Sequence, residues 1–218
     1  MSTQATVPTK RNARPGLRKA LAVGAAIVLL GAMALDTKIV RIGSDEDVRK
    51  ASFSPEDYGK TQFPIVQAEV EKRAVDAVTL YDALTADRAA AQEQYGVPAG
   101  TGPVFSTKFT GVVGEGKSGI YKVAVEGLPD TLTLRVQTGP AINGTELRDA
   151  TGTIEFGQFR NQIEYQDAGS ALNNEMKKEV LSKIDTSTLQ GKTIAVVGAF
   201  KLINPKSWLV TPVRLDIQ

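Results

Sequence analysis

The densest group of polar side chains lies in residues 139–174, and these side chains are the first candidates for chemistry. Arginine, carboxylate and amide groups form paired hydrogen bonds with hydroxylated ligands and with protein surfaces. We therefore interpret six residues as a candidate site for a ligand or a partner: Arg148, Asp149, Asn161, Gln162, Tyr165 and Asn173.

Two other interpretations of the same stretch stay open. Arg148 and Asp149 are also expected as a structural ion pair, with the Asn and Gln side chains bonding loop backbone groups. Asp149 and Glu164 are a formal candidate for the acid and base of glycoside hydrolysis. Their spacing does not bring the two carboxylates together, so we predict no catalytic residues.

The composition excludes many kinds of enzyme. The chain has 218 residues, of which 42% are hydrophobic and 23% charged, and it contains no cysteine and no histidine. Disulfides, thiolate zinc sites and cysteine nucleophiles need cysteine, and the Ser-His-Asp triad needs histidine. We predict a folded protein that is not an enzyme and that needs no metal or cofactor.

Five segments have the alternating pattern of β-strands, and they are residues 104–113, 120–126, 131–138, 193–203 and 209–217. In the third, Leu132, Leu134 and Val136 face one way. The fourth is apolar on both faces, which predicts a central strand covered on both sides.

Two regions have helical periodicity. Residues 53–95 are predicted to form a helical hairpin, with Pro64 in a first turn and Asp87 capping a short second helix over 88–94. Residues 168–184 carry apolar side chains at four-residue spacing, and Asp167 is the expected cap. The helix predicted over 168–184 lies between the third and fourth strands in the sequence.

Five strands with a helix between the third and fourth indicate an α+β fold with an OB-like five-stranded barrel. The Gly- and Pro-rich composition of residues 96–103 (GVPAGTGP) predicts a linker. The predicted organisation is a basic stub and signal-anchor helix over 1–35, a helical subdomain over 36–98 and the OB-like domain over 99–218.

The N-terminus has the pattern of an export leader. Residues 1–35 hold five of the 26 basic residues and none of the 24 acidic ones, which leaves residues 36–218 with a net charge of −3. The basic residues precede an uncharged run over 20–35, which places the N-terminus in the cytoplasm and the rest in the periplasm. An exported, net negative body argues against nucleic acid as a partner.

Retention and cleavage of this leader both stay open. Sixteen apolar residues span about 24 Å as a helix, less than a hydrocarbon core of about 30 Å. Residues 32–34 (AMA) also fit a cleavage site, which would release a free periplasmic protein. The charged flank over 37–41 favours a retained inner-membrane anchor, which is our prediction.

Several short motifs together resemble a bacterial family of predicted periplasmic lipoproteins, the domain-of-unknown-function family 2291. They are residues 37–42, 144–150 (GTELRDA), 161–165 (NQIEY), 172–173, 191–192, 198–200 and 210–213. The resemblance implies a helical subdomain joined to an OB-like barrel, and a role beside sugar-type ABC transporters. Thr37 stands where relatives have their lipidated cysteine, so this chain cannot carry that lipid.

From the residues and the resemblance we predict a non-enzymatic periplasmic accessory protein, anchored in the inner membrane. The expected partner is a transporter component or another envelope protein. The alternative is a binding module for a sugar or another small polar solute.

Overall fold

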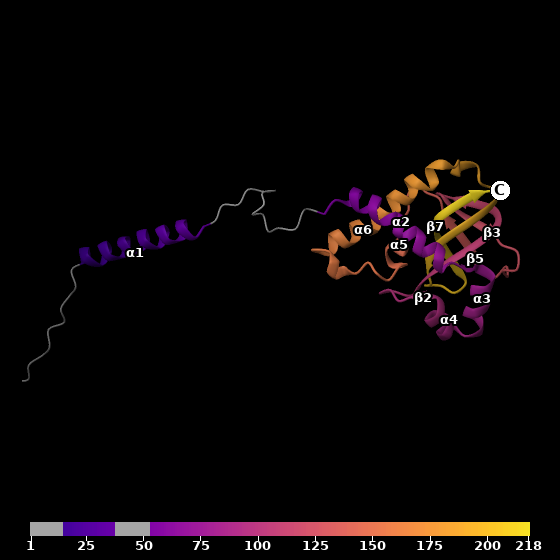
Figure 1. Cartoon of the computed structure of the whole chain (residues 1–218), viewed down its shortest axis with the longest axis horizontal. Coiled ribbons are helices and arrows are strands. Elements are labelled where there is room, and N and C mark those ends of the chain that lie inside the picture. The colour runs from indigo at the N-terminus through magenta and orange to yellow at the C-terminus, as the bar shows by residue number, and fades with distance from the viewer. Residues whose placement is uncertain (1–14, 38–52) are drawn as a thin grey trace, which may run out of the picture. The chain divides into compact units, whose positions relative to one another are not determined.

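The computed structural model describes residues 15–37 and 53–218, and the chain divides into the compact units Met1–Ser52 and Phe53–Gln218. Three basic residues of the leader, Lys10, Arg11 and Arg14, lie outside the described residues, and so does most of the family motif over 37–42. In the first unit the helix α1 (Pro15–Asp36) includes the apolar run (Figure 1). It has 22 residues, hence about 33 Å, and within the described residues it alone is long and apolar enough to cross a membrane.

Five strands of the second unit pair in a closed circuit, in the order β3-β4-β5-β7-β6 and back to β3. The β5–β7 pair is parallel and the other four pairs are antiparallel. This circuit confirms the predicted α+β, OB-like fold. The strands are β3 (Val104–Lys117), β4 (Ile120–Ala124), β5 (Thr133–Gln137), β6 (Thr193–Lys201) and β7 (Ser207–Ile217).

The strand β6 lies between β3 and β7, and every residue along it is buried or half-buried, in agreement with the predicted cover on both faces. The core beneath it contains stacked aromatic rings. The ring of Phe200 lies 4.6 Å from that of Trp208 and 5.7 Å from that of Phe105, and all three side chains are fully buried. Burial of such large apolar surfaces is the main source of the stability of this unit.

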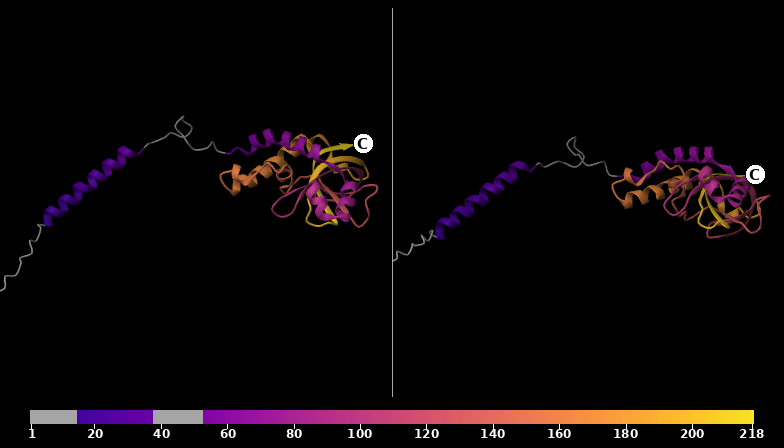
Figure 2. Two further views of the ribbon diagram at one scale, coloured as in Figure 1. Left: turned by 60° about the horizontal axis from the view of Figure 1, so that its bottom comes forward. Right: turned by 90° about the horizontal axis from the view of Figure 1, so that it is seen from below.

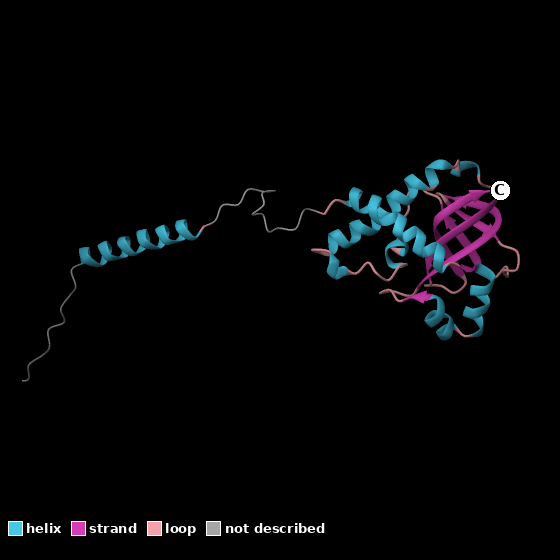
Figure 3. Ribbon diagram, in the orientation of Figure 1, coloured by secondary structure: helices cyan, strands magenta, loops and turns pink. Residues whose placement is uncertain are grey.

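Two helices, α2 (Pro55–Arg73) and α6 (Gln162–Glu179), pack against each other beside the sheet. Figure 3 shows these helices at one end of the unit and the strands at the other, and both views in Figure 2 keep that arrangement. Gly59 permits the close crossing, because a Cβ atom there would lie 2.8 Å from the carbonyl oxygen of Ala171.

The first arm of the hairpin predicted over 53–95 is interrupted, so the prediction of helical structure without a break up to Asp87 is wrong. The helix α2 begins at Pro55 with Ser54 as its N-cap, which places Pro64 inside the helix and not in its first turn. It ends at Arg73, because β1 (Val75–Asp76) pairs with β3. Two short helices follow, α3 (Ala77–Ala86) and α4 (Arg88–Tyr95), and β2 (Gly96–Val97) then pairs with β3.

Asp76 caps α3, and Asp87 caps α4 as predicted, each by accepting hydrogen bonds from two backbone N–H groups. These caps satisfy donors that the first turn of a helix leaves without partners. The predicted domain boundaries after residues 35 and 98 stay predictions.

The helix predicted over 168–184 begins six residues earlier and ends sooner. Asn161, not Asp167, is the N-cap of α6, and its side chain accepts a hydrogen bond from the backbone N–H of Glu164. Leu172 and Met176 are fully buried, as the apolar spacing predicts. The helix α5 (Glu146–Asp149) and the 3-10 turn η1 (Phe156–Gln158) precede α6, and the 3-10 turns η2 (Leu181–Lys183) and η3 (Thr186–Thr188) follow it.

Candidate functional site

Three of the six predicted site residues are in direct contact where α5 meets α6. The guanidinium of Arg148 donates from Nε to Oδ1 of Asp149 at 2.8 Å and from a terminal nitrogen to the carbonyl oxygen of Tyr165 at 3.0 Å. It also lies 3.6 Å from the centre of the Tyr165 ring, in cation–π geometry. The expected structural ion pair between Arg148 and Asp149 is therefore present, and both side chains are buried.

Lys201 on β6 completes this group, although it is 52 residues from Asp149 in sequence. Its Nζ donates to Oδ2 of Asp149 and to the hydroxyl of Thr145, both at 3.1 Å, and Thr145 donates to Asp149 at 2.7 Å. We call Thr145, Arg148, Asp149, Tyr165 and Lys201 the α5 network. It joins α5, α6 and β6 through one largely buried carboxylate, that of Asp149, which pairs with two basic side chains.

The network sets opposite pKa shifts on two neighbouring carboxyl groups. Burial raises the pKa of Asp149, but hydrogen bonds from Thr145, Arg148 and Lys201 outweigh burial and hold the pKa below its ordinary value. Burial dominates at Glu146 and raises its pKa, against its own backbone hydrogen bond and the attraction of Lys201. Asp149 is therefore a stable anion and not a proton donor near neutral pH.

The other predicted site residues have mainly local roles. Asn161 caps α6, and Asn173 is buried and donates from Nδ2 to the carbonyl oxygen of Gly144 at 3.0 Å. Gln162 is exposed on the first turn of α6. Glu164 is buried and accepts from both the backbone N–H and the side-chain Nε of Arg160, at 2.9 and 2.6 Å. Asp149 is thus paired with Arg148 and Lys201, and Glu164 is paired with Arg160.

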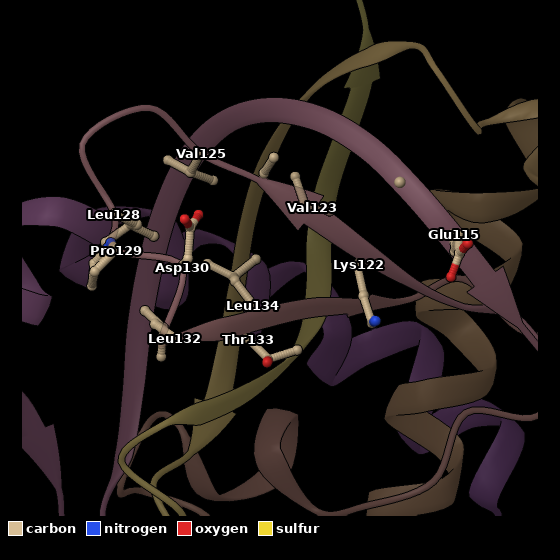
Figure 4. Close-up of a pocket in the computed structure, with 12 residues that line it drawn as sticks. Glu115, Lys122, Val123, Val125, Leu128, Pro129, Asp130, Leu132, Thr133 and Leu134 are labelled. Carbon is tan, nitrogen blue, oxygen red and sulfur yellow. The ribbon is translucent and has the colours of Figure 1, made fainter.

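A pocket of about 420 Å³ lies elsewhere, on the sheet, where β4 and β5 diverge (Figure 4). Pairing between these strands stops at Lys122 and Arg135, and the chain from Val125 to Leu132 crosses the opening. The floor contains buried apolar side chains, namely Val123, Leu132 and Leu134.

Charged side chains at the pocket are exposed and lie on different segments. Glu115 comes from β3, Lys122 from β4 and Asp130 from the connection to β5 (Figure 4). None of the three forms an ion pair or side-chain hydrogen bond with a residue that the structure describes. We call these three side chains the pocket rim. An apolar floor with a few polar groups at its edge is typical of binding sites.

The family model of the predicted periplasmic lipoproteins, domain of unknown function 2291, matches residues 23–216. The chain belongs to this family. The match includes α1 from residue 23 onward and all but the last two residues of the OB-like unit, and it agrees with a location in the cell envelope. The resemblance that the short motifs indicate is confirmed.

A crystal structure of an OB-fold protein from Thermotoga maritima has a similar fold, with a TM-score of 0.63 and 20% sequence identity. The match covers 77% of this chain and all of the Thermotoga chain. At this identity the similarity establishes the fold alone. No curated protein matches the chain.

This family member departs from the lipoprotein pattern at the position expected to carry lipid. The chain contains no cysteine, and Thr37 is the residue at which the family resemblance predicts the lipidated position. The hydroxyl of Thr37 donates to the carbonyl oxygen of Met33 at 2.6 Å, which continues the hydrogen bonding at the end of α1. The sequence therefore offers no thiol for lipid attachment, and α1 is the candidate anchor.

The sequence signal for the pocket is weak, and the prediction from the sequence missed it. Glu115, Lys122 and Asp130 lie outside the polar stretch 139–174 and are ordinary surface residues by type. The sequence signal for the pocket is limited to the segment 126–130 (EGLPD), a charged turn between two predicted strands. Among the described residues, no three His, Cys, Asp or Glu side chains lie close enough to hold a metal ion.

Proposed function

We propose that this protein is a non-enzymatic accessory protein of the periplasm that binds a partner protein through the pocket between β4 and β5. The observation that carries this proposal is the combination of a buried apolar floor with a rim whose charges have no partners in the described chain. Binding energy at protein interfaces is concentrated where one anchoring side chain fills such a pocket. The rim has a net charge of −1, which favours a partner with a basic side chain.

The proposed location is the inner membrane, with the N-terminus in the cytoplasm. Support comes from the 18-residue window Lys19–Asp36 of α1, which is long and apolar enough to cross a membrane, and from the exposure of its described apolar side chains. The basic residues of the N-terminal stub support the orientation. N-terminal sequencing of the mature protein tests retention, because Leu35 as the first residue would mean cleavage after Ala34.

The partner that we propose is a membrane-embedded component of a sugar-type ABC transporter, which is the expectation attached to the family resemblance. A helix that holds the protein at the inner membrane would keep it at the same surface as such a component. A non-enzymatic role is supported by the absence of histidine and cysteine from the sequence and by the basic partners of Asp149 and Glu164.

Site-specific photo-crosslinking in cells tests this function. We expect a photoreactive residue at Thr133, in the pocket, to crosslink to a transporter subunit, and one at Asp216 on β7 to give no such product. Asp130→Lys should lower the yield from position 133, whereas the matched charge reversal Asp216→Lys should not. Equal yields from both positions, or a yield indifferent to Asp130→Lys, would argue against the pocket as the interface.

The pocket volume supports one second candidate, a small polar solute. Small-molecule sites occupy roughly 300–1,000 Å³, and a volume of about 420 Å³ suits a sugar. A bound solute raises the melting temperature by mass action, so a panel of sugars distinguishes the two functions. For each variant, the melting temperature with sugar is compared with that of the same variant without sugar. Loss of the rise in Lys122→Ala would assign the solute to the pocket. Loss of the rise in Arg148→Ala, but not in Lys122→Ala, would assign it to the α5 network.

A further inference from the structure

A group of aromatic rings occupies the end of the second unit where the described chain resumes. Phe53, Tyr58, Phe159, Tyr165 and Phe156 form a continuous series of ring contacts, with centroids 5.3 to 5.7 Å apart. We call this series the aromatic end. It brings together the beginning of α2, the turn η1 and the first turn of α6.

The outer part of the aromatic end exposes apolar surface. Phe156, a member of the aromatic end, is 50% exposed, and Ile163, in the first turn of α6 seven residues later, is 68% exposed. Between and including them the segment holds one basic residue, Arg160, and no acidic residue. A segment of this composition, with aromatic and aliphatic side chains around a basic residue, matches the interfacial layer of a bilayer.

The exposed segment is held on a rigid base. The Tyr165 ring, which contacts both Phe156 and Phe159, is stacked on the buried guanidinium of Arg148 in the α5 network. Asn161 caps α6 between the two exposed apolar residues, and Glu164 pairs with Arg160. The surface is therefore preorganised, and presenting it to another surface costs little conformational entropy.

Chain connectivity supports a bilayer that holds α1 as the surface that the aromatic end meets. The helix α1 ends at Asp36, and only 15 residues, 38–52, separate Thr37 from Phe53. A chain of that length reaches less than about 60 Å even when fully extended. Phe53 is itself part of the aromatic end, so a membrane that holds α1 is nearer along the chain to this end than to any other part of the unit.

We propose that the aromatic end is a membrane-contacting surface, with Phe156 and Ile163 inserted into the interface of the bilayer that α1 spans. The docking requires the retained α1 of the proposed function. Its consequence is orientation: contact at the aromatic end turns the far side of the unit into the periplasm. Figure 1 shows the C-terminus on that far side, at the end of the unit opposite the start of α2.

Quenching of tryptophan fluorescence by brominated lipids measures this insertion directly. The full chain is placed, one copy per disc, in nanodiscs that contain acyl-brominated phosphatidylethanolamine and phosphatidylglycerol. Phe156→Trp is compared with the control Val112→Trp, because Val112 has a similar exposure of 48% in the wild type. Val112 lies near the C-terminus: its partner on the neighbouring strand, Thr193, accepts a hydrogen bond from the backbone N–H of Gln218. The native Trp208 is fully buried and supplies the same background in both variants.

We expect quenching of Phe156→Trp to exceed that of Val112→Trp at least twofold, with a blue-shifted emission. Adding Ile163→Asp to Phe156→Trp should remove most of the difference, while Ile217→Asp, an exposed change near the C-terminus, should not. Equal quenching at positions 156 and 112 in discs that hold the protein would overturn the membrane contact alone.

Two further outcomes would also overturn the docking. Quenching or a blue shift at position 156 that appears only when discs carry two copies would indicate a contact between copies in place of a contact with lipid. A chain that fails to co-elute with the discs would contradict the retained anchor, and it would also contradict the docking, which requires that anchor. The two failures are distinguishable, because co-elution is measured before fluorescence.

Discussion

The α5 network and the pocket rim each contain three charged side chains, but those of the network are buried and paired and those of the rim are exposed and unpaired within the described chain. Arg148, Asp149 and Lys201 have side chains that are 9–11% exposed, and each is bonded to another member. Glu115, Lys122 and Asp130 are exposed and have no described side-chain partner. Buried charges must be paired because desolvation is costly, whereas exposed charges remain available to a ligand.

The difference shows why a dense polar stretch in a sequence is a poor guide to a binding site. The residues that stand out between 139 and 174 do so because a loop that enters the protein interior needs many hydrogen-bonding groups. The rim residues are inconspicuous because their surroundings, and not their spacing, make them a candidate site. Four predictions test this contrast.

The largest effect is expected from Asp149→Ala, which leaves Arg148 and Lys201 buried without their common anion. We expect a loss of about 3–5 kcal/mol in the free energy of unfolding, the usual cost of removing one partner of a buried charge pair. Urea unfolding of the full chain in detergent, followed by the fluorescence of the buried Trp208, measures it. A loss below about 1 kcal/mol would mean that solvent reaches the network.

A smaller effect is expected at the start of α6. Asn161→Ala removes the side-chain oxygen that accepts from the Glu164 N–H, and loss of such a cap costs about 1 kcal/mol. Gln162→Ala, one residue later on the exposed first turn, is the matched control and should leave the free energy of unfolding unchanged. Equal losses in both variants would contradict the assigned cap.

The pH dependence of stability should respond in opposite directions to two neighbouring substitutions. The folded pKa of Asp149 is lowered from 3.8, so its contribution is present above that value and is lost as the pH falls below it. The folded pKa of Glu146 is raised from 4.5, so its protonated form favours folding, and that contribution is lost as the pH rises through the folded pKa.

Asp149→Asn should therefore flatten the loss of stability below about pH 4, and Glu146→Gln should raise stability at neutral pH relative to wild type. Urea midpoints between pH 3 and pH 7 provide the measurement. A neutral-pH gain in Asp149→Asn, or a loss in Glu146→Gln, would reverse the assigned signs.

The smallest effect on stability is expected at the rim. Asp130→Ala removes an exposed carboxylate without a side-chain partner, so the free energy of unfolding should change by less than about 0.5 kcal/mol. The same variant should nonetheless reduce crosslinking to a partner from Thr133. A clear destabilisation without loss of crosslinking would place Asp130 with the structural charges and remove the contrast between the two regions.

Local patterns in the sequence were enough to locate several elements. Alternation over residues 131–138 and 193–203 located β5 and β6, and four-residue spacing of Leu172 and Met176 located the body of α6. The order of these elements was enough to indicate the OB-like fold, and the uncharged run indicated α1. These elements could be predicted because the period of a strand or helix determines the spacing of apolar side chains among neighbouring residues.

Tertiary contacts alone decided where elements stop and which polar groups have partners. The helical pattern runs through Ala74, but pairing of Val75 and Asp76 with β3 ends α2 there. Asp149 depends on Lys201, 52 residues away, and the pocket exists because β4 and β5 separate after Lys122. Burial and charge pairing depend on residues distant in sequence, so local spacing could suggest an ion pair between Arg148 and Asp149 but not the closed network around it.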